Sequence, residues 1–330
     1  MIGFCLAAGA GRRLAPLTAT TPKPLLAPAG RPLIDLACDA LLKAGAERVV
    51  VNLHHGAEAI AAHLDGRAGV RAVREPVLLG TGGALVGARR AGLLGAGSGD
   101  PTVVVTCADH VVEPGDLEML ATSLERSGAP VAIGLGRGRS LPTFRLDGEL
   151  AVADPDGGWT ATGVFALRAG ILDAVPPGYS TMVESLLEPC WRRDELVGVP
   201  FGGAWADAGT LGRFLDVSAG LLAGRWPYPL PPGSLRRDAR GGPVFVAAGA
   251  RLDPGAIVAG PLVLDTGASA GEAAVLTRSV LSAGATVGGG ARVTGSVLGP
   301  GAELAAGEAA VAALLPGTPC RARPGAGRIG

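Results

Sequence analysis

Short apolar runs alternate with amphipathic segments over the first two-thirds of the chain, up to about residue 222. Runs rich in Val and Ile predict buried strands at residues 2–8, 48–53, 101–107 and 129–135. Apolar residues at helical spacing predict helices at residues 32–42, 57–64 and 114–126. Strands buried on both faces and separated by helices indicate an α/β fold with a mainly parallel sheet. Ligands of such folds bind beyond the carboxyl ends of the strands, so the chemistry is expected there.

The last part of the chain has a different period. Prolines and arginines crowd residues 223–242, which predicts a linker after a first domain of residues 1–222. Beyond the linker an apolar residue recurs about every six positions, often followed by Gly-Ala, as in LDTGAS and LSAGAT. This period predicts a short left-handed parallel β-helix at residues 243–316, with Gly or Ala at tight corners. A disordered Gly/Ala-rich segment is the alternative, and residues 317–330, which lose the period, are expected to be a loose tail.

Composition excludes several classes of protein. The 29 basic residues equal the 29 acidic residues, which argues against a general nucleic-acid binder. No stretch reaches the roughly 18 to 20 apolar residues that a membrane span needs, and an apolar N-terminal run that precedes its arginines is not a secretory signal. Five cysteines without CxxC spacing fit reduced thiols in a cytoplasm. We therefore expect a cytoplasmic protein with no membrane and no nucleic-acid partner.

The most informative segment is LAAGAGRRLAPLT at residues 6–18, followed by PKP at residues 22–24. Glycines let backbone N–H groups approach phosphates closely, and Arg12 and Arg13 add positive charge for a polyphosphate. A dinucleotide-binding GxGxxG loop is excluded, because Leu14 stands at the third glycine position and the second predicted strand ends with Asn52 rather than an acidic residue. The phosphate loop GxxxxGK[ST] is absent as well.

This segment resembles the signature of the nucleoside-diphosphate-sugar pyrophosphorylases, or sugar-1-phosphate nucleotidyltransferases, which is LAAG-x-G-[TS]-R-L-x-P-L-T followed by PKP. Every position matches except Arg12, where the family usually has Thr or Ser. Further matches follow in family order: GTGG at residues 80–83, Asp109, TGVF at residues 162–165 and WADAGT at residues 205–210. The resemblance spans residues 1 to about 222, implies a Rossmann-like catalytic domain, and agrees with the β-helix that several members append.

The resemblance implies a reaction between an NTP and a sugar-1-phosphate that gives an NDP-sugar and pyrophosphate, with Mg²⁺ as cofactor. The GTGG pattern and the hexads look most like those of mannose-1-phosphate guanylyltransferases, which favours GTP and mannose-1-phosphate. UDP-, ADP- or dTDP-sugar pyrophosphorylases of the glucose type, or an enzyme for a cyclitol or alcohol phosphate, are the alternatives. A homologue that regulates without catalysing is a different class, but it would have lost Arg13, Lys23 or a metal-binding carboxylate.

Site residues carry over by motif position. Arg13 would stabilise the leaving pyrophosphate, and Lys23 would bridge phosphates. Only two of the 29 basic residues are lysines, so a lysine in the PKP position is itself a signal for a compact charge. Asp109 and Asp207 would hold Mg²⁺, which prefers carboxylate and phosphate oxygens. The remaining assignments are nucleotide binding by Leu6, Ala7, Ala8, Gly9, Gly11, Gly80 and Thr81, and sugar binding by Gly163, Asp154 and Glu184.

Each assignment has a plainer alternative. Arg12 fits an ordinary solvated arginine, Asp109 and Asp207 are possible helix caps, and Cys107 fits simple packing. His110 fits a structural role, because Mg²⁺ seldom binds imidazole. The pair His54-His55 fits a loop.

Two departures from the family leave the sugar open. Cys107-Ala108 stand where many members have Asn-Gly before the carboxylate. The usual Glu-Lys-Pro before the sugar-contacting glycine is missing; Asp154 is a candidate replacement for the Glu, and Arg137, Arg139 or Arg145 for the cation.

All four histidines precede residue 111, so the β-helix has no histidine base for acyl transfer. The β-helix is therefore expected to support a homo-oligomer.

Overall fold

The computed structural model describes residues 1–95, 100–137 and 143–317. It divides into two compact units. The first, which we call the sheet unit, comprises Met1–Ala8, Ala37–Ala57 and Leu64–Trp205. The second, the β-helix unit, comprises Gly9–Leu36, Glu58–His63 and Ala206–Gly330.

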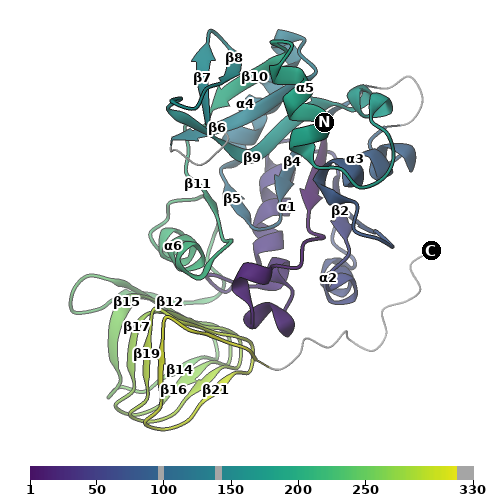
Figure 1. Ribbon diagram of the computed structural model, residues 1–330. Coiled ribbons are helices and arrows are strands. Elements are labelled where there is room, and N and C mark those ends of the chain that lie inside the picture. The colour runs from purple at the N-terminus through teal and green to yellow at the C-terminus, as the bar shows by residue number, and fades with distance from the viewer. Residues whose placement is uncertain (96–99, 138–142, 318–330) are drawn as a thin grey trace. The chain divides into compact units, whose positions relative to one another are not determined.

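The sheet unit contains a nine-stranded sheet in the order β3-β2-β1-β4-β9-β6-β10-β8-β7 (Figure 1). Strands β1 to β4 run parallel, as do β6 and β10, whereas β9 runs antiparallel to both of its neighbours. The predicted mainly parallel sheet is therefore confirmed, with an antiparallel insertion. The strands are β1 Ile2–Leu6, β2 Val49–Leu53, β3 Val70–Arg74, β4 Thr102–Cys107, β6 Val131–Arg137, β7 Thr143–Asp147, β8 Leu150–Ala153, β9 Trp159–Arg168 and β10 Leu196–Pro200.

Helices bury the central strands. Val103, Val104 and Val105 of β4 are fully buried, as expected for a strand covered on both faces. Helix α4, Pro114–Ser127, packs on β4, β6, β9 and β10. It begins with Pro in its first turn and ends at Gly128 in the left-handed conformation, φ +69°. The other helices and short strands are α1 Leu33–Lys43, α2 Ala57–Leu64, α3 Gly80–Arg90, α5 Glu188–Trp191, α6 Leu211–Leu222, β5 His110–Val112 and β11 Trp205–Asp207.

The repeats of the β-helix unit form coils with three faces (Figure 1). Register partners on successive coils are 17 or 18 residues apart, as between Val258 and Leu276 and between Leu276 and Val293, so each coil takes three hexads. The buried core is almost entirely Ala, Val and Leu. The strands are β12 Gly233–Arg237, β13 Pro243–Ala247, β14 Arg251–Leu252, β15 Ile257–Leu264, β16 Ser269–Ala270, β17 Val275–Leu281, β18 Thr286–Val287, β19 Arg292–Thr294, β20 Val297–Leu298, β21 Glu303–Leu304, β22 Ala309–Val311 and β23 Leu314–Leu315.

Serine hydroxyls satisfy the backbone at one corner of the coils. Ser279 Oγ donates to Thr277 O at 2.7 Å and accepts from Ser296 N at 3.2 Å. Ser296 Oγ repeats the pattern one coil later, donating to Thr294 O at 2.8 Å and accepting from Ala313 N at 3.0 Å. Both serines are buried, and backbone groups satisfy their hydroxyls.

Other segments of the chain pack into the β-helix unit. Helix α6 packs on β13, β15 and β17, and Arg278 of β17 pairs with Asp216 of α6 at 2.7 Å. Residues 223–242, predicted as a linker, include the exposed strand β12 and the buried side chains of Trp226 and Tyr228. None of the helices in the described residues has the length and apolar character that crossing a bilayer requires.

Candidate active site

A buried hydrogen-bond chain holds the end of β1 in the sheet unit. Ala7 N donates to Asn52 Oδ1 at 2.9 Å, and Asn52 Nδ2 donates to Glu75 Oε1 at 2.8 Å. Glu75 Oε2 accepts from Leu79 N at 3.3 Å, just before α3 begins at Gly80. Asn52 and Glu75 are only 4% and 8% exposed. These hydrogen bonds thus fix Ala7 relative to the start of α3.

Gly80 and Thr81 begin α3 against the segment around Ser180. Gly80 has φ +74°, and a Cβ there would lie 2.4 Å from Ser180 O. The same carbonyl accepts from Gly82 N at 2.9 Å, and Thr81 Oγ1 accepts from Met182 N at 2.8 Å. Only glycine fits at position 80, because both the backbone conformation and the space exclude a side chain.

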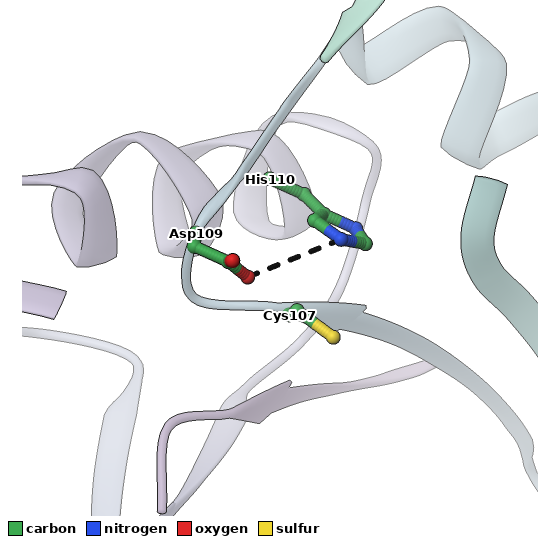
Figure 2. Close-up of side chains that lie close together, drawn as sticks. All are labelled: Cys107, Asp109 and His110. Atoms are coloured by element: carbon green, nitrogen blue, oxygen red, sulfur yellow. Dashed lines mark ion pairs between the residues drawn. The ribbon is translucent and has the colours of Figure 1, made fainter. Parts of the chain in front are cut away.

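Asp109 lies in the turn between β4 and β5, beside Cys107 and His110 (Figure 2). One donor atom from each of the three residues lies within 4.8 Å of the other two. Asp109 Oδ1 is 3.9 Å from His110 Nε2, and the two side chains are 18% and 10% exposed. Helix α4 has Glu113 at its N-cap, so helix capping does not account for Asp109.

Gly163 packs directly on the imidazole of His110. Its φ is +76°, and a Cβ there would lie 2.8 Å from His110 Cε1. Trp205 packs edge-to-face with the same ring, with 5.9 Å between the centroids. These two contacts hold the imidazole of His110 in place next to Asp109.

The remaining predicted sugar-site residues make local contacts. Glu184 Oε2 accepts from Thr181 Oγ1 at 2.8 Å, and Asp154 Oδ1 accepts from Asp156 N at 2.9 Å. Arg145 Nε is 3.6 Å from Asp154 Oδ2, so the carboxylate already has a cationic neighbour. Arg137 stacks on Trp159 at 3.9 Å from the ring centroid, and Arg139 lies outside the described residues.

Gly11 and Lys23 lie together in the β-helix unit. Gly11 has φ +64° and precedes the 3₁₀ turn Arg12–Leu14, and a Cβ there would lie 2.9 Å from Lys23 Cβ. The turn Lys23–Leu25 begins at the lysine itself. Gly9 is exposed and has nothing within 4 Å of its Cβ position, so the loop leaves open space beside its backbone.

Arg13 and Asp207 meet at Gly209 in the same unit. A Cβ on Gly209 would lie 2.6 Å from both Arg13 Nη2 and Asp207 Oδ1. Asp207 also accepts from Gly209 N at 3.1 Å and pairs with Arg213, while its side chain stays 14% exposed. Thr210 is the N-cap of α6, so Asp207 is not the capping residue.

Comparisons with known proteins decide the family. Residues 2–142 match the family model described as nucleotidyl transferase. The chain is 24% identical over 333 residues to UTP–glucose-1-phosphate uridylyltransferase of Synechocystis sp., covering 85% of this chain and 82% of that protein. It is 32% identical over 242 residues to N-acetylmuramate alpha-1-phosphate uridylyltransferase of Neisseria meningitidis, covering 68% and 100%. It is 30% identical over 297 residues to mannose-1-phosphate guanylyltransferase of Mycobacterium tuberculosis, covering 83% and 78%.

The chain belongs to the sugar-1-phosphate nucleotidyltransferase family. It is a transferase that moves a nucleotidyl group to a sugar phosphate and releases pyrophosphate. The sequence signature and these similarities therefore agree on the class of reaction.

The predicted site residues of this nucleotidyltransferase form separate groups. In the sheet unit, hydrogen bonds through Asn52 and Glu75 connect Ala7 with the start of α3. Gly163 packs on His110, which lies beside Asp109. In the β-helix unit, Gly11 lies with Lys23, and Arg13 lies with Asp207. Asp154 and Glu184 have local partners only.

Sequence reasoning missed the role of Asn52 and did not consider Glu75. A signal was present, because the chain contains one Asn and no Gln, so Asn52 carries its only side-chain amide. An amide both donates and accepts, which the position between the Ala7 N–H and a carboxylate requires. A single amide in 330 residues, placed at a predicted strand end, marks a position with a specific hydrogen-bonding task.

Proposed function

We propose that this nucleotidyltransferase transfers a guanylyl group from GTP to mannose-1-phosphate and releases pyrophosphate. The observation that carries the substrate choice is the similarity to a mannose-1-phosphate guanylyltransferase over 83% of the chain. The loop sequence at residues 6–18 and the GTGG segment at residues 80–83 support it as well.

In this proposal, backbone groups of the loop bind the nucleotide. Leu6, Ala7, Ala8, Gly9 and Gly11 would contact base and phosphates, and the anchored Ala7 gives that loop a fixed origin. Gly80 and Thr81 would contact the nucleoside. Arg13 and Lys23 would neutralise charge on the triphosphate, which lowers the barrier when charge builds on the leaving pyrophosphate.

The carboxylates fit Mg²⁺. Asp109 and Asp207 offer hard oxygen ligands on side chains that are 18% and 14% exposed, so each is accessible yet partly shielded. Mg²⁺ bound there would draw charge from the phosphate oxygens. Gly163 would contact the sugar through its backbone, with Asp154 and Glu184 as further sugar ligands. The enzyme is further proposed to be cytoplasmic and homo-oligomeric.

A second substrate pair is UTP with N-acetylmuramate 1-phosphate. The favouring observation is the similarity to the Neisseria enzyme, which covers all of that protein's length. Departures around Asp154, where the family's Glu-Lys-Pro is absent, are consistent with an unusual sugar or another phosphorylated acceptor.

The deciding experiment measures pyrophosphate release from a panel of NTPs crossed with a panel of sugar-1-phosphates, with and without Mg²⁺. The proposal expects GTP with mannose-1-phosphate to have the highest kcat/KM, and expects release to require Mg²⁺. Preference for UTP with N-acetylmuramate 1-phosphate would replace the guanylyl assignment. Absence of release with every pair would contradict the proposed activity.

A further inference from the structure

The turn after β4 brings together three different metal-binding donors. Cys107 contributes a sulfur, Asp109 a carboxylate and His110 an imidazole, and one donor atom of each lies within 4.8 Å of the others (Figure 2). Cys107 ends β4, Asp109 lies in the turn and His110 begins β5, so four consecutive residues supply all three donors. This set differs from the pair of carboxylates that we assign to Mg²⁺.

The spacing suits one small ion. The Asp109 Oδ1 to His110 Nε2 distance of 3.9 Å is too long for a hydrogen bond. Two ligands of a tetrahedral ion with bonds of about 2.0 to 2.3 Å lie about 3.3 to 3.8 Å apart. The donors therefore need shifts of about an ångström or less to bind one ion together.

The surroundings favour a defined ligand geometry. His110 is 8% exposed, and both Gly163 and Trp205 pack against its ring. A ring held in this way loses little conformational entropy when it binds an ion. The Asp109 side chain is 18% exposed, so solvent reaches the carboxylate that would bind the ion.

We propose that Cys107, Asp109 and His110 form a site for a thiophilic first-row ion, Zn²⁺ or Co²⁺, with the fourth position open to water. Thiolate and imidazole bind such ions well, whereas Mg²⁺ binds oxygen ligands and gains little from either. Binding converts the Cys107 thiol to a thiolate, and the proton passes to the buffer. No electron is transferred, and the ion keeps its charge.

The site has a consequence for catalysis that rests on the proposed function. Asp109 cannot serve both ions fully, so Zn²⁺ at this site would withdraw a ligand from Mg²⁺. Low concentrations of Zn²⁺ would then inhibit nucleotidyl transfer even with Mg²⁺ in excess. The Cys107→Ser variant should keep its Mg²⁺-dependent activity but lose that sensitivity.

Co²⁺ spectroscopy tests the site without reference to activity. Metal-free full-length protein is titrated with Co²⁺ in the presence of excess Mg²⁺. The expected result is a sulfur-to-cobalt charge-transfer band in the near ultraviolet, with intense visible bands of a tetrahedral ion, all removed by adding Zn²⁺. Cys107→Ser should lose the charge-transfer band and bind Zn²⁺ at least about 100-fold more weakly by calorimetry.

Matched variants make the result decisive. Cys190→Ala removes a buried thiol of α5 and should leave the bands unchanged. His110→Asn provides a second ligand variant if Cys107→Ser unfolds, which circular dichroism would reveal. The absence of a charge-transfer band in folded wild-type protein, or a band that persists in Cys107→Ser, would overturn the site. Neither result depends on which nucleotide or sugar the enzyme uses.

Discussion

The two units use buried polar side chains in different ways. In the β-helix unit, Ser279 and Ser296 are buried and bond to corner backbone, and the pattern repeats from one coil to the next. In the sheet unit, Asn52 and Glu75 bond to each other as well as to backbone, and the pair belongs to no repeat. The comparison indicates that the repeats provide stability through similar positions on successive coils. At the ends of β1 and β2, by contrast, the local structure depends on a few unique side chains. Substitutions should therefore separate the two kinds of region.

Loss of a metal-binding carboxylate should have the largest effect. Asp109→Asn and Asp207→Asn should each lower kcat by about 1,000-fold, because a neutral amide binds Mg²⁺ poorly. Pyrophosphate release gives the rate, and circular dichroism confirms folding. Asp173→Asn and Asp216→Asn change carboxylates that pair with arginines elsewhere, and they should keep near-normal rates. A near-normal rate in Asp109→Asn or Asp207→Asn would show that its metal assignment is wrong.

Truncation of a β-helix core residue should affect stability instead. Leu281 is fully buried among the small side chains of the coils. Leu281→Ala should lower the free energy of unfolding by about 2 to 5 kcal/mol, since it removes buried methyl groups and leaves a cavity. Urea unfolding measures the loss. Below the unfolding transition kcat should stay unchanged, and a lower kcat in fully folded protein would remove the distinction between the core of the coils and the candidate site.

The Asn52–Glu75 pair can be tested by reversing it. Asn52→Asp keeps an acceptor for Ala7 N but places two carboxylates next to each other. Glu75→Gln has only one side-chain acceptor oxygen, so it can accept from Asn52 or from Leu79 N but not from both. Each should raise KM for the NTP about 10- to 100-fold, because the loop after β1 loses its anchor.

The double variant Asn52→Asp/Glu75→Gln restores a complete chain with the donor and acceptor exchanged. Its KM should return toward that of the wild type, with kcat and thermal stability as parallel readouts. If the double variant is no better than the single variants, or if stability alone responds, the pair does not position the nucleotide loop.

The smallest effects should come from corners of the β-helix. Ala273 has φ +56° and is exposed, whereas the matching corner one coil later is Gly290 with φ +68°. Ala273→Gly should stabilise the protein by up to about 1 kcal/mol, because it relieves left-handed strain. Gly290→Ala should destabilise it by about 1 to 2 kcal/mol, since a Cβ there meets only open space and adds strain alone. Changes of the same sign would contradict this account of the corners.

The regular parts of the fold were predictable from the sequence. Strands rich in β-branched residues lie within one or two residues of their predicted limits, as for β2 and β4. The hexads predicted the coils because each repeat presents one apolar residue to the core. The grouping of Gly9–Leu36 with the β-helix was not predictable, since it depends on contacts between distant segments, such as Leu17 with Gly299.

Candidate site residues could be proposed from the sequence where a residue type carried the signal. Lys23 stood out as one of two lysines. The left-handed conformations of Gly11 and Gly163 were not predicted and come from the structure. Glu75 was not apparent, because its burial and its bonds to Asn52 and Leu79 depend on how two strand ends meet. Periodicity in the sequence does not report such pairings.

Measuring kcat and the free energy of unfolding for Asp109→Asn and Leu281→Ala side by side tests the contrast between a site residue and a core residue of the coils. We expect Asp109→Asn to lose about 1,000-fold in kcat with little change in unfolding free energy. Leu281→Ala should lose about 2 to 5 kcal/mol of stability with an unchanged kcat. The contradicting result is that both variants lose activity and stability together, which would show that the turn after β4 and the core of the coils do not have separate roles.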